Sequence, residues 1–410
     1  MKNVPTAFVT LLFGLAPLAA HALSEPLSET AIDAADFTVW EQQQREAAAI
    51  ASAARRDPTI PEAEPAEGPA DEAVPPTDPA AVEAAAEGVD SPAPPEIAVT
   101  DEPGQVVETP AFSTDGPDEA ALETADEQKT PDPFLIRLQV LLDRAHASPG
   151  VIDGYLGENT RKAIRAYEQM RDLPADGQPD IDLWNILVVD QGKAMTTYEI
   201  TETDISERYV EEIPSDYGLM AEMEWLGYLD PVEMLAERFH MDVDLLKMLN
   251  PNADFGSAGS VILVPDVRPE PSAKVARIVI DKAGGTLTAY DADGAIVLSG
   301  PATVGASETP SPEGALTITS IAPDPTYHYE PAKNFQQGDN AEALTIPPGP
   351  NGPVGSMWIG LSEPTFGIHG TAHPELIDKS WSHGCVRLTN WDAEALSGLV
   401  EPGITEVEFR

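Results

Sequence analysis

Apolar residues recur at helical spacing over three stretches between residues 131 and 190. A turn at Asp153-Gly154 separates the first stretch from the second, and Asn159 is expected to cap the second. The apolar positions are Leu135, Leu138, Leu141, Leu142, Ala163, Ile164, Tyr167, Leu183, Trp184 and Leu187. The pattern predicts a small all-α unit of three helices over residues 131–190.

A second, smaller unit is predicted over residues 216–267. Two short helical stripes are followed by a run of strand-forming residues from Ile262 to Pro265. Asn250-Pro251 is expected to close the second helix. This order predicts a small α/β module.

From Lys274 onward, short β-branched runs alternate apolar with polar residues. Gly284-Gly285 and Asp293-Gly294 interrupt these runs in the manner of hairpin turns. Further strands are predicted at 316–321, 356–361, 366–370 and 405–409, with one helix over 389–400. Residues 274–410 are therefore predicted to form a mostly β domain, which makes the whole chain multidomain.

The segment before these units has the composition of a linker. Residues 57–130 hold twenty Asp and Glu against a single Lys, with many Pro and Ala. Such a segment buries too little apolar surface to offset its ordering entropy. Residues 23–130 are therefore predicted to be an acidic, disordered, self-repelling linker, although residues 30–56 could form a helix.

The first 22 residues have the pattern of a secretory signal peptide. Lys2 precedes an apolar run over about residues 7–20, and Ala20-His21-Ala22 is a small-x-small cleavage pattern. The run is shorter than a membrane-spanning helix and contains Gly14 and Pro17. We expect cleavage after Ala22, export to the periplasm and no membrane anchor.

The formal net charge of −47 excludes a basic footprint for nucleic acid and disfavours anionic membrane surfaces. The chain has one cysteine, Cys385, so an internal disulfide is impossible. In an oxidising compartment, a single thiol is expected to be either buried or used chemically.

Three of the histidines fall near Cys385: His369, His373 and His383. His369 and His373 have the spacing of two metal ligands on a helix, but Gly370 and Pro374 disfavour a helix there. His383 and Cys385 could share a metal ion only if both point the same way, and no Asp or Glu adjoins them to orient the imidazoles. The sequence therefore favours no metal site, and no cofactor is expected.

A thiol catalyst fits the cluster better. A cysteine nucleophile needs a base or a positive environment, and a nearby imidazole supplies both in a thiolate–imidazolium pair. Gly384 permits a tight turn in which the amides of His383, Gly384 and Cys385 could bind an oxyanion. Arg387 could fix a substrate carboxylate. The alternative from residue chemistry alone is a buried structural cysteine beside a core histidine.

The paired motifs GIHGT at 367–371 and SHGCVRL at 382–388 closely resemble the signature of YkuD-type L,D-transpeptidases. The segment TPSPEGALTI at 309–318 is similar to another segment of that family. The resemblance implies that Cys385 is the nucleophile and that His369, oriented by the carbonyl of Gly370 or of a neighbouring residue, is the base. His383 would shape the oxyanion region, Ser382 and Gly384 would build the turn, and Arg387 would hold the site or the substrate. His373 matches nothing in the motif and is expected in a solvent-facing loop.

The upstream units also carry resemblances. Residues 131–190 resemble a peptidoglycan-binding-like domain through the matches Leu138, Gln139, Leu142, Asp153, Gly154, Gly157, Thr160, Ala163, Ile164 and Tyr167. Residues 216–267 resemble a degenerate LysM module, which lacks that family's opening Gly-Asp-Thr-Leu turn. A spacer without glycan binding is the alternative for this second unit.

These resemblances imply acyl transfer on peptidoglycan stem peptides, without a cofactor. Cys385 would attack the carbonyl of the diamino acid at stem position three and release D-alanine. An amine of another stem would give a 3–3 cross-link, an amine of an envelope protein would anchor that protein, and water would make the enzyme a carboxypeptidase. A thiol hydrolase of protein–wall links is a further alternative. An inert wall-binding protein is disfavoured, because both His369 and Cys385 are present.

Overall fold

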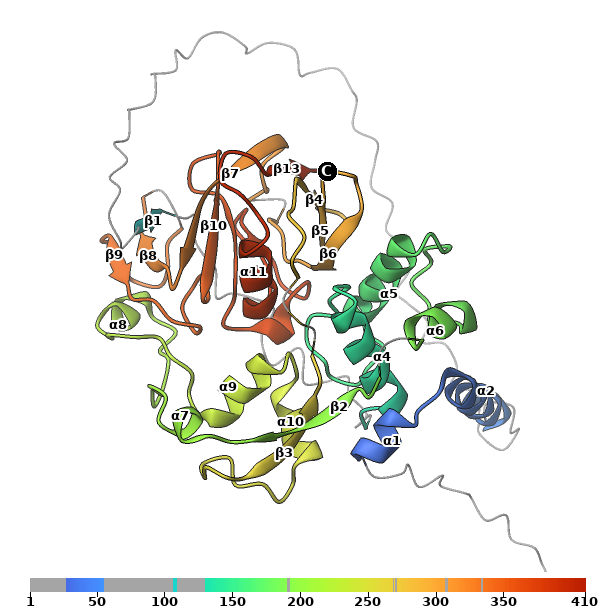
Figure 1. Ribbon diagram of the computed structural model, residues 1–410. Helices are drawn as coiled ribbons and strands as arrows, with labels where there is room; N and C mark the ends of the chain where they lie inside the picture. Colours follow the sequence, from blue (N-terminus) through green and yellow to red (C-terminus); the bar gives the residue numbers. More distant parts are fainter. Residues whose placement is uncertain are drawn as a thin grey trace, which may run out of the picture.

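The computed structural model of the chain describes residues 27–54, 106–108, 130–189, 192–267, 269, 271–306, 309–332 and 335–410 (Figure 1). The predicted signal peptide and most of the predicted linker lie outside the described residues. Among the residues that are described, no helix combines the length and the hydrophobicity needed to cross a bilayer.

The N-terminal part of the predicted linker is helical. Helices α1 (Glu29–Asp33) and α2 (Phe37–Ala54) follow one another, and Ile32 and Phe37 are buried. The Trp40 ring stacks on Phe134 at 4.8 Å between ring centroids. Residues 27–54 therefore differ from the prediction of a linker beginning at residue 23, because their apolar side chains pack on the following unit. A further described segment, β1 (Val106–Glu108), pairs in parallel with strand β8 (Thr326–Tyr329).

The three predicted helices of the next unit are α4 (Pro133–Arg144), α5 (Glu158–Met170) and α6 (Ile181–Leu187). The side chain of Gln139 is buried and donates to Asp153 Oδ1 at 2.7 Å and to Thr160 Oγ1 at 3.0 Å. The predicted cap of α5 is wrong, because Gly157 is the N-cap residue. Asn159 instead donates to the carbonyl of Ile377, in the β domain, at 3.0 Å.

The second unit begins earlier than predicted. Strand β2 (Met195–Glu199) pairs antiparallel with β3 (Val261–Pro265), and α9 (Pro231–Arg238) and α10 (Val243–Leu249) contribute to the same core. Between β2 and α9 the chain makes the short helices α7 (Glu202–Ile205) and α8 (Tyr217–Ala221). Strand β2 was missed because it lies before residue 216, where the predicted unit begins, whereas β3 lies within the predicted range 216–267.

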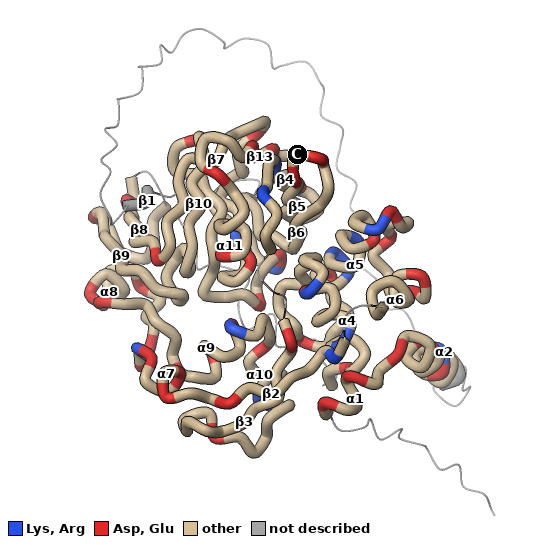
Figure 2. Tube along the Cα trace, in the orientation of Figure 1, with Lys and Arg blue, Asp and Glu red and all other residues tan. Residues whose placement is uncertain are grey.

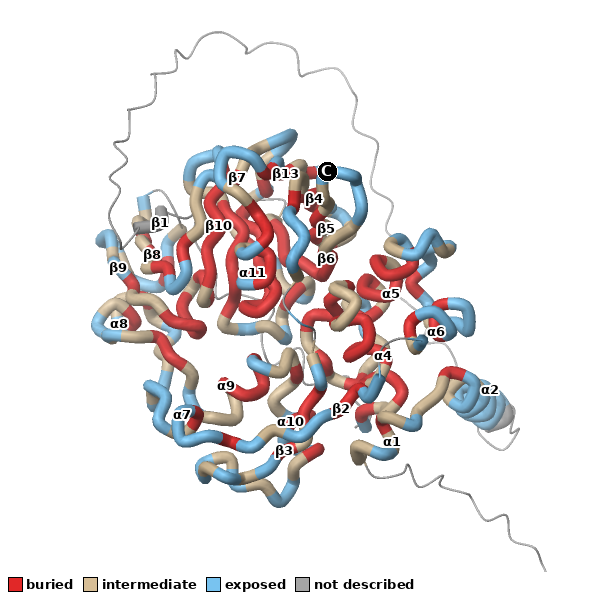
Figure 3. Tube along the Cα trace, in the orientation of Figure 1, coloured by how far each residue is buried: buried red, intermediate tan, exposed pale blue. Residues whose placement is uncertain are grey.

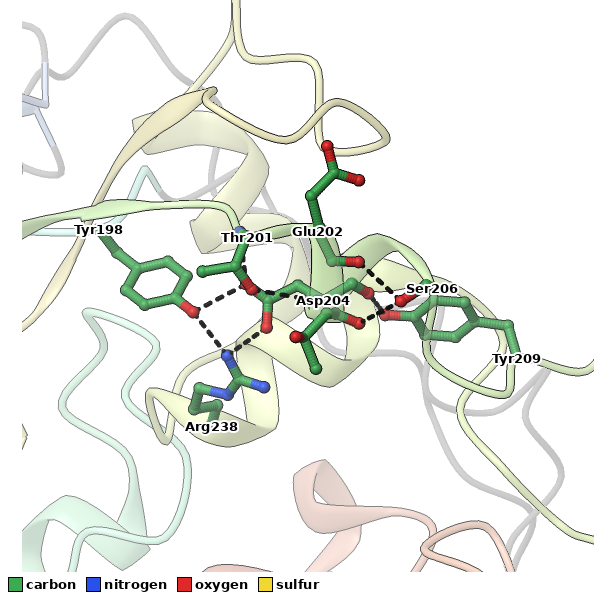
Figure 4. Close-up of polar contacts among 8 residues, drawn as sticks. Tyr198, Thr201, Glu202, Asp204, Ser206, Tyr209 and Arg238 are labelled. Carbon is green, nitrogen blue, oxygen red and sulfur yellow. Dashed lines mark hydrogen bonds and ion pairs between the residues drawn. The ribbon is translucent and has the colours of Figure 1, made fainter.

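A buried carboxylate fastens α7 to α9 (Figure 4). Asp204 accepts hydrogen bonds from the Tyr198 hydroxyl at 2.7 Å, from the Thr201 amide at 2.8 Å and from Arg238 Nη1 at 2.7 Å. Burial acts to raise the pKa of Asp204, but the hydrogen bonds outweigh it and lower this pKa to about 2. The network therefore holds an ionised carboxylate as a structural anchor.

The C-terminal unit is built on an eight-stranded sheet in the order β12-β11-β10-β7-β13-β4-β5-β6. The strands are β4 (Arg277–Asp281), β5 (Thr286–Tyr290), β6 (Ile296–Pro301), β7 (Gly314–Pro323), β10 (Met357–Leu361), β11 (Gly367–His369), β12 (Val386–Arg387) and β13 (Glu406–Phe409). Helix α11 (Asn390–Ser397), capped by Thr389, packs on the sheet, where buried positions concentrate (Figure 3). A second sheet pairs β9 (Leu344–Ile346) with β8.

The first two units each contact the C-terminal unit, through polar side chains in one case and stacked rings in the other. Ser148 Oγ of the helical unit donates to Asp392 of α11 at 2.8 Å. Lys162 of the same unit forms an ion pair with Asp378. The ring of His240, next to α9, stacks on Trp391 of α11 at 5.2 Å. Acidic positions are distributed over all three units (Figure 2).

Candidate active site

The pairing of two short strands brings the two sequence motifs together. β11 and β12 are parallel, with Ile368 opposite Val386 and His369 opposite Arg387. Because side chains alternate along a strand, the two pairs point to opposite faces of the sheet. Ile368 and Val386 enter the core that contains α11. His369 and Arg387 therefore point to the other face, and Cys385 lies one residue before β12.

His369 is held in one tautomer and one orientation. Its side chain is 1% exposed, and Nδ1 lies 2.7 Å from the carbonyl oxygen of Gly370. A carbonyl only accepts, so Nδ1 carries the proton and Nε2 carries the lone pair. Trp358 stacks on the imidazole at 5.6 Å. Of the carbonyl groups that the resemblance left open, the structure shows that of Gly370 beside Nδ1.

The turn before Cys385 requires glycine. Gly384 has φ +112°, and a Cβ there would lie 2.5 Å from the Phe366 ring. Ser382 Oγ donates to the carbonyl of Cys385 and accepts the Gly384 amide at 3.2 Å. The Gly384 amide is thus used within the turn, which differs from the predicted nest in which it faces an oxyanion.

Burial makes the thiol and the imidazole neutral. It raises the pKa of Cys385 to about 12, although the Gly367 backbone and the charge of Arg387 act against it. Burial also lowers the pKa of His369 to about 3, and Arg387 adds to this effect. Residue chemistry alone had favoured a thiolate–imidazolium pair. In this covered site neither charge is solvated, so the neutral pair is favoured.

Arg387 supplies the positive charge of the site. Burial lowers its pKa to about 10, and Tyr217, Cys385 and Tyr327 partly offset this. The pKa of His383 is also lowered, by burial first and by Arg387 second. The guanidinium therefore remains charged at neutral pH and acts on the thiol and both histidines.

Aromatic side chains cover the thiol. Cys385 is 4% exposed and shares a buried cluster with Tyr217, Tyr327 and Trp358. Phe335 stacks on the imidazole of His383 at 4.9 Å. The site is closed in this structure.

The histidines do not form a metal-ligand pair. His369 lies in β11, whereas His373 precedes a short 3₁₀ helix (Pro374–Leu376) and its side chain is 68% exposed. His373 is thus a solvent-facing loop residue, as predicted. Within the described ranges, no group of three His, Cys, Asp or Glu side chains could hold a metal ion.

Two units of this chain are similar to known protein families. The family model described as "L,D-transpeptidase catalytic domain" (YkuD) matches residues 275–409, and the one described as "Putative peptidoglycan binding domain" matches residues 132–187. Among solved structures, L,D-transpeptidase 3 from Mycobacterium tuberculosis aligns with 37% of this chain and 75% of its own, at 18% identity and a TM-score of 0.28.

The curated relatives include the "Putative L,D-transpeptidase YkuD" of Bacillus licheniformis. It is 31% identical over 176 residues, which is 42% of this chain and 90% of the relative. The Bacillus subtilis protein of the same name is 29% identical over 175 residues, again 42% of this chain and 90% of the relative. The chain belongs to the YkuD family of L,D-transpeptidases. The resemblance seen in the sequence is therefore confirmed, and the enzyme is an L,D-transpeptidase.

The L,D-transpeptidase site also contains a residue that the sequence analysis missed. Asn390 fits between two glycines: a Cβ at Gly355 or Gly370 would lie 2.2 or 2.1 Å from Asn390 Oδ1. Asn390 Oδ1 also accepts the Ser356 amide at 3.1 Å. Asn390 therefore supports the backbone that orients His369. Gly370, next to the motif histidine, was the signal in the sequence, because a glycine there indicates that another group packs closely against the backbone.

Tyr217 is a second residue that the sequence did not single out, and it shares a buried cluster with Cys385. It lies far upstream, outside the residues matched by the catalytic family model. Nothing in the local sequence separates it from other tyrosines. Tyr327 and Tyr329 are fully buried in the same cluster.

Proposed function

We propose that this L,D-transpeptidase acts on peptidoglycan tetrapeptide stems and joins them by 3–3 cross-links. Cys385 attacks the carbonyl of the diamino acid at position three, and the bond to the terminal D-alanine breaks. The amine of an acceptor stem then attacks the thioester and regenerates the thiol.

The pairing of β11 with β12 carries the proposal, because it sets His369 beside the residues that flank Cys385. The lone pair of His369 Nε2 accepts the thiol proton as the sulfur attacks. The imidazolium then donates this proton to the departing D-alanine amine. When the acceptor amine attacks, its proton passes through His369 to the thiolate that leaves. A neutral thiol and a neutral imidazole are the correct starting forms for this sequence.

The proposed positioning groups surround this reaction. Ser382 and Gly384 fix the turn that carries the nucleophile. Arg387 supplies positive charge for a substrate carboxylate or for the developing oxyanion. His383, stacked on Phe335, shapes the adjoining wall.

The proposal includes an extracytoplasmic location, through export by residues 1–22. The unit matched at residues 132–187 would hold the enzyme on peptidoglycan. The unit of residues 195–265, in which α9 and α10 share a core with the β2–β3 pair, would bind glycan as a LysM-like module or act as a spacer. A protein amine is a further acceptor compatible with the same thioester.

The test is to incubate the protein with disaccharide-tetrapeptide and identify the products by mass spectrometry. A dimer that lacks one D-alanine supports cross-linking. Tripeptide alone supports the acyl-enzyme step and points to water or a protein amine as the acceptor. The Cys385→Ala variant is the control: it should bind peptidoglycan and give neither product. Residual turnover in that variant would rule out the proposed nucleophile.

A further inference from the structure

Part of the cover over the thiol comes from outside the catalytic family match. Residues 213–227, here called the strap, include α8 and connect α7 with α9 of the second unit. The strap leaves its own unit and lies beside β8 and β9 (Figure 1). The transpeptidase family model begins only at residue 275. The catalytic unit alone would therefore lack this part of the cover.

Tyr217 is the side chain that the strap inserts. It is 2% exposed. Its ring meets Tyr329 at 5.3 Å, Tyr327 at 5.8 Å and Phe335 at 6.1 Å, each in an edge-to-face arrangement. These contacts join the strap to the β8–β9 region that covers the site.

Polar contacts fasten the strap at the same place. The side chain of Gln337 donates to the carbonyl of Ser215 at 2.9 Å and accepts the amide of Tyr217 at 3.1 Å. Asn340 Nδ2 donates to Asp216 Oδ2 at 3.1 Å. These three hydrogen bonds connect side chains of the cover to the segment immediately around Tyr217.

The far end of the strap is fastened through its backbone. The amide of Leu226 donates to the carbonyl of Pro348 at 2.9 Å, and the amide of Asn351 donates to the carbonyl of Leu226 at 3.0 Å. Gly349, at φ +145°, permits the close approach, since a Cβ there would lie 2.1 Å from the Leu226 oxygen. The strap is thus held at both ends, with Tyr217 near one of them.

The inserted ring and the proposed nucleophile share one buried cluster, which contains both Tyr217 and Cys385. Phe335 connects Tyr217 to His383 by successive ring contacts. The charge of Arg387 acts on the Tyr217 hydroxyl as well as on the thiol. Protein interiors are close-packed, so a stem peptide cannot reach a thiol that is 4% exposed while this cover stays in place.

We propose that Tyr217 gates the donor pocket: the strap covers Cys385, withdraws to admit a stem peptide and returns to exclude water from the acyl-enzyme. The nature of the donor rests on the proposed function, whereas the gating of the thiol does not. The strap connects to the unit that precedes the catalytic domain, so that unit contributes directly to the active site.

The single cysteine makes the gating measurable. We would alkylate the full chain with iodoacetamide and with a bulkier maleimide, and follow intact mass over time. Tyr217→Ala should raise both rates at least about tenfold, because the closed population falls when its ring contacts are lost. The Gln337→Ala/Asn340→Ala double variant keeps the ring and cuts the polar contacts, and it should also raise both rates. It carries the test if Tyr217→Ala does not fold.

Tyr290→Ala is the control. Tyr290 lies in β5, where the guanidinium of Arg277 stands over its ring at 4.6 Å, and it does not belong to the cluster around the thiol. Its alkylation rates should equal those of the wild type. Unchanged rates in a folded Tyr217→Ala variant would overturn the proposal, as would an equal rise in Tyr290→Ala.

Turnover supplies a second readout that general destabilisation does not move. With tetrapeptide as donor, Tyr217→Ala should shift the products from cross-linked dimer toward tripeptide, because water reaches the thioester. An unchanged product ratio in a folded variant would count against gating. If alkylation responds as expected but no protein releases D-alanine, gating stands and the proposed reaction fails.

Discussion

Glu237 and Asn390 join the second unit to the catalytic domain through a fully buried contact. Asn390 Nδ2 lies 3.2 Å from Oε1 and 3.0 Å from Oε2 of Glu237. Asn390 packs against Gly370, whose carbonyl accepts the proton of His369 Nδ1. A carboxyl group from the second unit therefore holds Asn390, which packs against the residue whose carbonyl orients His369.

Glu237→Gln should flatten the pH dependence of stability. Burial raises the pKa of Glu237 to about 8 from an ordinary value of 4.5, and Glu233 and Glu394 add to the rise. The unfolded chain loses this proton near pH 4.5, so the stability that it contributes is lost as pH rises toward 8. We expect the wild type to lose about 2–3 kcal/mol relative to the variant between pH 5 and pH 8. Urea unfolding of both proteins at pH 5 and pH 8 measures this difference. Equal losses of unfolding free energy in the wild type and the variant would contradict the prediction.

Gly384→Ala should damage the nucleophile turn. The substitution places a Cβ at φ +112°, 3.1 Å from the Pro310 carbonyl and closer still to Phe366. Strain of this kind costs about 1–3 kcal/mol, and displacement of Cys385 should abolish D-alanine release. Gly398→Ala is the control, because Gly398 has φ −69° and its added Cβ meets only the Ala395 carbonyl, at 3.6 Å. Thermal melting and product analysis should show wild-type stability and wild-type D-alanine release for Gly398→Ala. Equal losses of stability and activity in the two variants would refute the steric argument.

His369→Ala should slow acylation of Cys385 about 10²- to 10⁴-fold, the contribution expected of a general base. A carbapenem is a suitable probe, since the family chemistry implies that it acylates the nucleophile and adds its mass to the intact protein. The wild type should gain this mass and Cys385→Ala should not. Equal rates in wild type and His369→Ala would exclude His369 as the base.

His369 should also make the fold sensitive to acid. Burial lowers its pKa from 6.5 to about 3, so below pH 6.5 the unfolded chain binds a proton that the folded chain does not. Stability should therefore fall as pH decreases from 6.5 toward 3. Comparison of His369→Gln with the wild type by urea unfolding at pH 4 and pH 7 isolates this contribution. Between pH 7 and pH 4 the variant should lose less unfolding free energy than the wild type. A larger loss in the variant would contradict this prediction.

Asp204→Asn should destabilise the second unit by about 1–3 kcal/mol at pH 7, because Arg238 and Tyr198 lose a charged acceptor. The pKa of Asp204 is lowered from 3.8 to about 2. The stabilisation is thus present above pH 3.8 and is lost as pH falls toward 2. Melting at pH 7 and pH 3 tests this. Asp254→Asn, at an exposed carboxylate in the same unit, should change stability little at either pH.

Residue types and their spacing were enough to predict much of the fold. Hairpin glycines and β-branched runs predicted β4, β5 and β6, and leucine spacing predicted α4. The local geometry of helices and strands requires these patterns, so the elements can be recognised in the sequence without knowledge of their tertiary contacts. The cap of α5 was mispredicted because a contact with Ile377, in another unit, uses Asn159. Strand β2 was missed because its partner lies more than sixty residues later in the sequence.

The sequence by itself determined the chemistry: one thiol, the histidine motifs around it, the glycine that its turn requires and the family to which they belong. Tertiary structure decided whether Cys385 and His369 are ionised and whether other molecules can reach them. Whether Cys385 and His369 exist as an ion pair depends on desolvation, and desolvation depends on the groups that cover them. The cover comes partly from Tyr217, in a unit whose sequence carries no sign of the active site. Proximity of residues so distant along the chain is a property of packing, and no local pattern encodes it.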